Sequence, residues 1–344
     1  MRENGTAADA AVAALFCEGV TCPQSAGIGG GLVLTYFDKA SGKVETIVGR
    51  EVAPAAAHED MFVNWTTING PKAIAVPGEL KAYWELHQKY GKLPWARLVQ
   101  PTIDLCRKGH VVSVYLSRIL NRRRNTIFSS PTLAEIYVDP KTKDVYQEGD
   151  LVKRLKLAET LEVIAKEGAD TLYNNGTIAQ KLVAEIKQLG GIVTIEDLMN
   201  YRTRWEAPNV AKLPNNNTLY SITAPASGPL IAFIANIMRG FAPEDINTVV
   251  SQARIAEAFK YAYAERTELA DPKFVDDVNG LIANLTNPDF AENIRLRIRD
   301  NETSQDWRHY GAEFDLTRDS GTAHLNVLAP NGDAVSVTSS VNTL

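Results

Sequence analysis

The last part of the chain has the pattern of a two-stranded hairpin, and this pattern limits what the chain can fold into. Polar and apolar residues alternate over 322–329 and again over 334–341. Such alternation is typical of strands that bury one face. Between the two runs lies Asn331-Gly332, a dipeptide that favours a hairpin turn. The pattern therefore predicts an antiparallel pair of strands.

The register of this hairpin decides which polar side chains meet. A two-residue turn would pair Thr322 with Val341 and mix the two faces, because a one-residue slip reverses every side chain. A three-residue loop over 331–333 instead pairs Thr322 with Asn342 and keeps polar residues opposite polar residues. We expect this second register, which places Ser340 and Asn342 on the same face as Thr322.

Thr322 stands at the start of the first predicted strand, directly after the small residues Ser320 and Gly321. A threonine hydroxyl is a poor nucleophile unless a base is held beside it. When threonine is the first residue of a chain, its own α-amine can be that base, because this amine titrates near ~7.7–8.0. We therefore expect self-cleavage between Gly321 and Thr322 that makes Thr322 an N-terminal nucleophile. An ordinary, half-solvated hairpin is the alternative interpretation.

A series of short segments, in this order along the chain, carries a family pattern. They include Arg50-Glu51-Val52-Ala53-Pro54 and Gly321-Thr322-Ala323-His324-Leu325. The others are residues 5–11, 27–31, 75–79, 93–98, 190–194, 226–229, 264–266 and 271–276. Together they resemble the gamma-glutamyltransferases (glutathione hydrolases), which are members of the N-terminal-nucleophile hydrolase superfamily.

The resemblance implies an α/β fold, the four-layer αββα sandwich of N-terminal-nucleophile hydrolases, with the nucleophile at the start of a strand. We expect one domain over 1–344, in which 1–321 is a helix-rich large-subunit region and 322–344 is the beginning of a small-subunit region. Strands are expected near 31–37 and 43–49, after a first helix over 6–18 that Thr6 and Asp9 cap. Further helices are expected over 78–90, 95–108, 112–124, 151–166, 177–189 and 250–270.

The resemblance also assigns roles to particular residues. Thr322 is implied as the catalytic nucleophile, with the substrate-binding residues Ser340 and Asn342 beside it. Family members commonly have threonine where this chain has Ser340, which keeps the hydroxyl. Arg50 follows a predicted strand, and its planar fork suits bidentate capture of a carboxylate. The resemblance implies that Arg50 holds the substrate's α-carboxylate, whereas from the residues alone a surface ion pair is the simpler interpretation.

The activity implied is hydrolysis of glutathione and its conjugates, and transfer of the γ-glutamyl group to amino-acid or dipeptide acceptors, without a cofactor. The small subunit would come from the same precursor. Because the chain stops at Leu344, other residues of the family's site cannot be mapped, and we expect this polypeptide alone to be inactive. The alternatives are a truncated, inactive secreted relative that binds γ-glutamyl ligands or a protein, and a different amidase such as a β-lactam acylase. The context of Arg50 argues against the acylase.

Charge and motifs argue against several other classes of function. A net charge of −5 gives no electrostatic reason to expect a nucleic-acid partner, and the basic run 122–124 is typical of a solvated helix face. The glycine run 27–31 lacks the spacing of nucleotide-binding loops, so we interpret it as a tight turn with positive φ angles. The five histidines form no pair with metal-ligand spacing, and no metal is expected.

Sequence signals for location are indirect. The family is secreted or anchored on the outer face of the plasma membrane, so we expect an extracellular protein with further residues upstream of Met1. No run of about 18 apolar residues indicates a membrane span. Six Asn-x-Ser/Thr sequons are candidate glycosylation sites, at Asn4, Asn64, Asn175, Asn216, Asn284 and Asn301.

Overall fold

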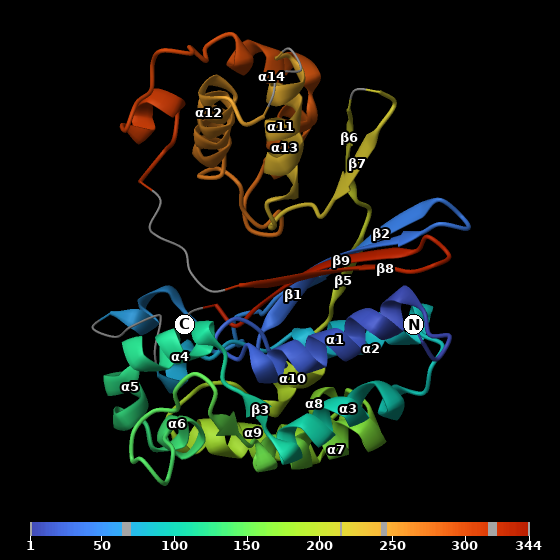
Figure 1. Ribbon diagram of the computed structural model, residues 1–344, viewed down its shortest axis with the longest axis vertical. Helices are drawn as coiled ribbons and strands as arrows, with labels where there is room; N and C mark the ends of the chain where they lie inside the picture. The colour runs from blue at the N-terminus through green and yellow to red at the C-terminus, as the bar shows by residue number, and fades with distance from the viewer. Residues whose placement is uncertain (1, 64–69, 214, 242–245, 316–321, 343–344) are drawn as a thin grey trace. The chain divides into compact units, whose positions relative to one another are not determined.

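The computed structural model describes residues 2–63, 70–213, 215–241, 246–315 and 322–342 (Figure 1). The chain forms two compact units. Unit 1 contains Met1–Gly42, Ile47–Arg204 and Ser320–Leu344, and unit 2 contains Lys43–Thr46 and Trp205–Asp319. The single domain expected over 1–344 stays a prediction. The described residues include no helix long and apolar enough to cross a membrane.

A five-stranded sheet joins the two ends of the sequence. Its strands are β1 (Gly31–Asp38), β2 (Lys43–Gly49), β5 (Arg204–Glu206), β8 (Ala323–Leu328) and β9 (Ala334–Ser340), in the order β5-β2-β1-β9-β8. β9 is antiparallel to both of its neighbours, β1 and β8. The predicted strands near 31–37 and 43–49 and the C-terminal hairpin are thus confirmed as elements, and the hairpin lies directly beside the first strand of the chain.

The register expected for the hairpin is wrong by two residues. Ala323 lies opposite Ser339, so that Thr322 faces the position of Ser340 and not Asn342. The reason lies in Asp333, which joins the ladder: its backbone C=O accepts from the Ala329 N–H at 2.8 Å, and its carboxylate accepts from the Lys39 N–H at 2.9 Å. A two-residue shift returns each side chain to the same face. The predicted polar and apolar faces are therefore kept.

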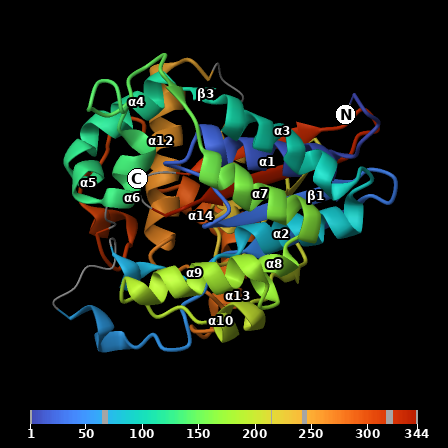
Figure 2. The same ribbon diagram turned by 90° about the horizontal axis from the view of Figure 1, so that it is seen from below.

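Helices α1 (Ala7–Thr21) and α2 (Glu79–Tyr90) cover the apolar face of the sheet (Figures 1 and 2). The predicted capping box of α1 is present, because Thr6 Oγ1 accepts from the Asp9 N–H and the Asp9 carboxylate accepts from the Thr6 N–H. The residues that this face buries alternate along the strands, as the sequence pattern requires. They include Leu32, Leu34, Tyr36, Val335 and Val337.

The remaining helices of unit 1 lie farther from the sheet (Figure 1). They are α3 (Trp95–Lys108), α4 (Val114–Arg122), α5 (Arg124–Ser129), α6 (Pro131–Tyr137), α7 (Leu155–Glu167), α8 (Asp170–Tyr173), α9 (Thr177–Gln188) and α10 (Ile195–Asn200). The helix expected over 112–124 breaks at Arg123, whose φ and ψ of −99° and 13° are not helical. The helix expected over 151–166 begins later, because β4 (Leu151–Val152) pairs with β3 (His110–Val111).

Unit 2 has its own helical core. Helices α11 (Gly228–Arg239), α12 (Val249–Glu265), α13 (Val278–Thr286) and α14 (Pro288–Arg295) pack together, and β6 (Asn209–Lys212) pairs with β7 (Thr218–Ser221). Buried Phe233, Ile237, Ala258 and Leu285 belong to this core. The helix expected over 250–270 ends at Glu265, where the Thr267 hydroxyl donates to the carbonyl of Ala264 at 2.6 Å.

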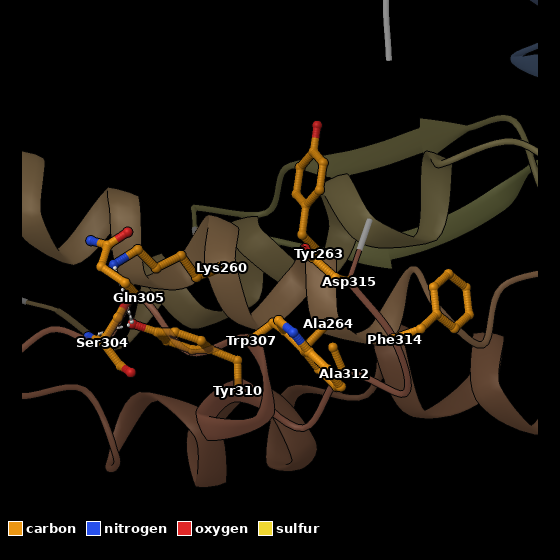
Figure 3. Close-up of a pocket in the computed structure, with 10 residues that line it drawn as sticks. All are labelled: Lys260, Tyr263, Ala264, Ser304, Gln305, Trp307, Tyr310, Ala312, Phe314 and Asp315. Atoms are coloured by element: carbon orange, nitrogen blue, oxygen red, sulfur yellow. Dashed lines mark hydrogen bonds between the residues drawn. The ribbon is translucent and has the colours of Figure 1, made fainter. Parts of the chain in front are cut away.

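A pocket of about 230 Å³ opens in unit 2 beside the short helix Trp307–Tyr310. Figure 3 shows that aromatic side chains, including Tyr263, Trp307 and Phe314, form much of its lining. The Lys260 ammonium at this pocket donates to the Glu257 carboxylate at 2.9 Å. Its charge is therefore compensated inside the unit, and the pocket presents mainly apolar surface.

Candidate active site

The predicted nucleophile lies at one edge of the sheet with its expected neighbours. The exposed Thr322 donates its hydroxyl to Ser340 Oγ at 3.5 Å, the long limit for such a bond. The backbone N–H of Asn342 donates to the same oxygen at 3.1 Å. Asn342 has a φ of +78°, a left-handed conformation that asparagine tolerates better than most residues. The structure thus brings together the three residues predicted in this hairpin, with Ser340 as the shared partner.

Ser340 is held by the glycine run expected to form a tight turn. Gly27 has a positive φ of +152°, as that expectation requires, but Gly30 serves a different purpose. A Cβ on Gly30 would lie 2.2 Å from the carbonyl oxygen of Ser340, so only glycine allows this close approach. The Gly30 carbonyl accepts from the N–H groups of Gly78 and Glu79 at 3.0 and 3.1 Å. These contacts tie the start of α2 to the end of β9.

Arg50 emerges at the same edge of the sheet as Thr322. The topology explains this, because β2 ends, β1 begins, β9 ends and β8 begins at this edge. A Cβ on Gly31 would lie 2.7 Å from both Gly49 O and Glu51 Oε2, and Gly31 pairs with Ser340. The Arg50 side chain is 42% exposed, and its Nε lies 3.3 Å from Glu51 Oε2. Much of its planar fork can therefore receive an incoming carboxylate.

Tyr201 holds the backbone of Arg50 in place, a role that the sequence did not predict. Its hydroxyl donates to the backbone carbonyl of Arg50 at 2.8 Å, and the side chain is only 3% exposed. Burial raises the pKa of Tyr201, so the hydroxyl keeps its proton and remains a donor. Gly78 makes room for it, since a Cβ there would lie 2.0 Å from the tyrosine oxygen.

Comparison with known families shows to which family a chain with these residues belongs. The profile of the family described as Gamma-glutamyltranspeptidase matches residues 1–344. The chain belongs to this family. The predicted family is therefore confirmed, and the roles predicted for Thr322 and Arg50 stay predictions within a gamma-glutamyltranspeptidase chain.

Curated relatives in the gamma-glutamyltranspeptidase family are similar over the whole chain. Scoloptoxin SSD14 of Scolopendra dehaani is 42% identical over 99% of this chain and 60% of its own length. Glutathione hydrolase 5 proenzyme of Rattus norvegicus is 37% identical over 100% of this chain and 61% of its own length. Glutathione hydrolase 2 of Arabidopsis thaliana is 34% identical over 99% of this chain and 59% of its own length. The chain thus spans about three-fifths of the length of these relatives.

Solved structures show the same family fold. Gamma-glutamyltranspeptidase from Pseudomonas nitroreducens, complexed with L-DON, is 30% identical with a TM-score of 0.79, covering 90% of this chain and 92% of that chain. Helicobacter pylori gamma-glutamyltranspeptidase is 29% identical with a TM-score of 0.80, covering 88% of each. Cephalosporin acylase from Bacillus halodurans, at 24% identity and a TM-score of 0.81, shows the fold alone; it covers 99% of this chain and 62% of that chain. The predicted N-terminal-nucleophile hydrolase fold is confirmed.

Other sequence predictions for this gamma-glutamyltranspeptidase chain concern the cleavage site, glycosylation and metal binding. Gly321 and the sequon at Asn64 fall outside the described residues. The remaining candidate asparagines are all exposed, and they are Asn4, Asn175, Asn216, Asn284 and Asn301. In the part of the chain that the structure describes, no group of three His, Cys, Asp or Glu side chains could hold a metal ion.

Proposed function

We propose that this chain is the precursor of a glutathione hydrolase, or a large part of one. Its active form would hydrolyse glutathione and its conjugates and transfer γ-glutamyl groups to amino-acid or dipeptide acceptors. The observation that carries the proposal is the contact between the hydroxyls of Thr322 and Ser340 at the start of β8, in a chain of this family. The names of two relatives, Glutathione hydrolase 5 proenzyme and Glutathione hydrolase 2, support it.

The first step of the proposed mechanism is self-cleavage. The Thr322 hydroxyl loses its proton and attacks the carbonyl carbon of Gly321. The C–N bond breaks as a C–O ester bond forms, and the departing nitrogen takes a proton to become the α-amine of Thr322. Water then hydrolyses the ester, which leaves a carboxylate on Gly321 and a free hydroxyl on Thr322. Ser340 Oγ, which accepts the Thr322 hydroxyl, is placed to orient it for the attack.

The second step uses the new α-amine. At neutral pH this amine is partly unprotonated and can take the proton of the Thr322 hydroxyl as it attacks the γ-carbonyl of glutathione. The cysteinyl-glycine part leaves as an amine, and a γ-glutamyl ester remains on Thr322. Water or the amine of an acceptor then attacks this ester. The exposed fork of Arg50 would hold the α-carboxylate of the glutamyl group during both attacks.

We also propose an extracellular protein that pairs with a small subunit made from the same precursor. The exposed sequon asparagines support the location, because four of them, Asn4, Asn175, Asn216 and Asn301, lie outside helices and strands, and glycans are added to accessible surface loops of secreted proteins. Peptide mapping before and after removal of N-linked glycans tests this proposal. Unmodified peptides at all of these positions would contradict it.

Mass spectrometry on the full-length protein tests the proposed function. We expect a second chain that begins at Thr322, and, after brief reaction with glutathione and an acid quench, a γ-glutamyl group on the Thr322 peptide. A protein that stays uncut and binds glutathione without hydrolysing it would favour the alternative of an inactive binding relative. A cut protein without the adduct or any turnover would point to another substrate class.

Removing the Tyr201 hydroxyl should weaken substrate binding without removing any catalytic group. In Tyr201→Phe the partly buried carbonyl of Arg50 loses this donor, which typically costs up to ~1–3 kcal/mol and lets Arg50 shift. We expect KM for a γ-glutamyl anilide to rise about three- to tenfold while kcat changes little. Tyr173→Phe is the matched control, because that buried hydroxyl donates to Pro77 O instead. Equal KM values for the two variants would contradict the assignment.

A further inference from the structure

A fully buried acid lies under the strands that carry the nucleophile. Glu79, the first residue of α2, is 0% exposed. Its Oε2 accepts from the Ser339 hydroxyl at 2.8 Å, and its Oε1 contacts the Tyr83 hydroxyl. Ser339 is likewise 0% exposed, on the helix-covered face of β9, an internal strand of the sheet. A buried acid is costly unless every polar atom is paired, so this network has to be complete for the fold to tolerate it.

Ser339, a member of this network, is adjacent to the residues next to Thr322 on both strands of the hairpin. Ser339 lies directly opposite Ala323, the residue after Thr322, and directly before Ser340, whose hydroxyl contacts Thr322. Because side chains alternate along a strand, Ser339 points towards α2 while Ser340 points to the other face. A shift of Ser339 would therefore move both the strand that carries Thr322 and the hydroxyl that orients it.

The backbone of Glu79 is also connected to the end of β9, through Gly30. Its N–H and that of Gly78 donate to the Gly30 carbonyl, and Gly30 packs against the Ser340 backbone without room for a Cβ. The start of α2 thus contacts β9 at Ser339 through a side chain and at Ser340 through Gly30. We propose that Glu79 is a positioning residue for the reactions of Thr322, acting through Ser339. This inference rests on the proposed function.

The charge state of Glu79 provides a readout. Burial raises its pKa to about 8; the hydrogen bonds from Tyr83 and Ser339 oppose that rise, while the charges of Glu51 and Glu18 add to it. These groups come from α2, β9, the segment after β2, and α1. At neutral pH Glu79 therefore keeps its proton and completes the network without a buried charge. Above pH 8 it becomes a buried carboxylate near two other acids, and this charge is expected to weaken the packing of α2 against β9.

A purely structural role is the competing interpretation, and a matched control separates the two. Asp9 is also buried, at 1% exposed, and accepts from the backbone N–H groups of Lys92 and Leu93. It lies in the first turn of α1, whereas Gly19 of that helix approaches Gly27 at the site. At 1.5 Å per residue, Asp9 is about 15 Å along the helix from Gly19. Asp9→Asn should lower the stability of the fold without changing the position of Thr322.

The experiment follows self-cleavage in the full-length protein. Wild type, Glu79→Gln, Glu79→Ala, Ser339→Ala and Asp9→Asn are made by cell-free synthesis, and the rate of cleavage after Gly321 is measured by denaturing mass spectrometry. Thermal melting of uncleavable Thr322→Ala versions reports stability separately. We expect cleavage to slow at least about tenfold in Glu79→Ala and about threefold or more in Ser339→Ala. Glu79→Gln, which keeps a neutral group of the same shape, should restore most of the rate, and Asp9→Asn should not slow it.

The pH profile gives an independent test. The ratio of the wild-type rate to the Glu79→Gln rate is expected to fall between pH 7 and pH 9.5, because only the wild type ionises there. Any one of three results would overturn the proposal. The first is a folded Glu79→Ala protein that cleaves at the wild-type rate, and the second is a ratio that stays constant with pH. The third is a set of rate losses that follow the melting temperature in every variant, Asp9→Asn included. If Glu79→Ala does not fold, Ser339→Ala and the ratio still decide. A wild type that never cuts after Gly321 would instead refute the proposed function.

Discussion

Thr322→Ala is expected to leave the full-length protein uncut after Gly321 and without γ-glutamyl hydrolase activity. The change removes a hydroxyl that donates to Ser340 Oγ, and with it the nucleophile of both proposed steps. Loss of a covalent nucleophile typically lowers kcat by ~10⁴-fold or more. Denaturing mass spectrometry shows the uncut chain directly, and release of a chromogenic anilide measures the residual activity.

Thr322→Ser is the matched control for this prediction. Serine keeps a hydroxyl at the same position, so cleavage and turnover should persist at a reduced rate. The loss in Thr322→Ala is then assigned to the hydroxyl and not to a change in the hairpin. Cleavage between residues 321 and 322 in the alanine variant would refute self-cleavage by Thr322.

Arg50→Ala should produce the second-largest effect, and only for substrates that carry an α-carboxylate. Truncating one partner of a charge-assisted, bidentate pair costs ~2–5 kcal/mol, so we expect kcat/KM for a γ-glutamyl anilide to fall about 10²- to 10³-fold. Arg50→Lys should recover only part of this loss, because an ammonium cannot present two parallel donors. The Arg50–Glu51 contact is partly exposed and screened, so its loss should contribute little.

The substrate itself supplies the control for Arg50. A 4-aminobutanoyl anilide has the same reacting carbonyl and no α-carboxylate. The wild-type enzyme should hydrolyse it poorly, and Arg50→Ala should change that rate little. If both substrates lose the same factor, Arg50 supports the fold or the loop and does not bind the carboxylate.

Local pattern predicted most of the elements that build this edge, and the reason is that their signals are local. Alternation located both strands of the hairpin, and the capping residues Thr6 and Asp9 located the start of α1. The register was off by two residues because it depends on Asp333, whose carboxylate is held by the backbone of Lys39 at the other end of the sequence. A pattern read along one segment contains no information about such a partner.

The residues that support the site could not be predicted from the sequence for the same reason. Arg50 stands in a recognisable motif, but Tyr201, which supports it, is 151 positions away in the sequence. Ser339 and Glu79 are separated by 260 positions. In one sequence, Tyr201 looks like an ordinary core tyrosine and Glu79 like a favourable first-turn acid at a helix start. Only the fold shows that both contact residues at the reactive edge.

The position of β9 between β1 and β8 has a consequence for the protein after it is cut. Hydrogen bonds join β9 to β1 from Gly31 opposite Ser340 to Phe37 opposite Ala334. A break between residues 321 and 322 would leave β1 on one polypeptide and β9 with β8 on the other. What had been an internal ladder becomes an interface between two chains, continuous with the hydrophobic interior. The two products would therefore stay together through native purification and separate only when the sheet itself is denatured.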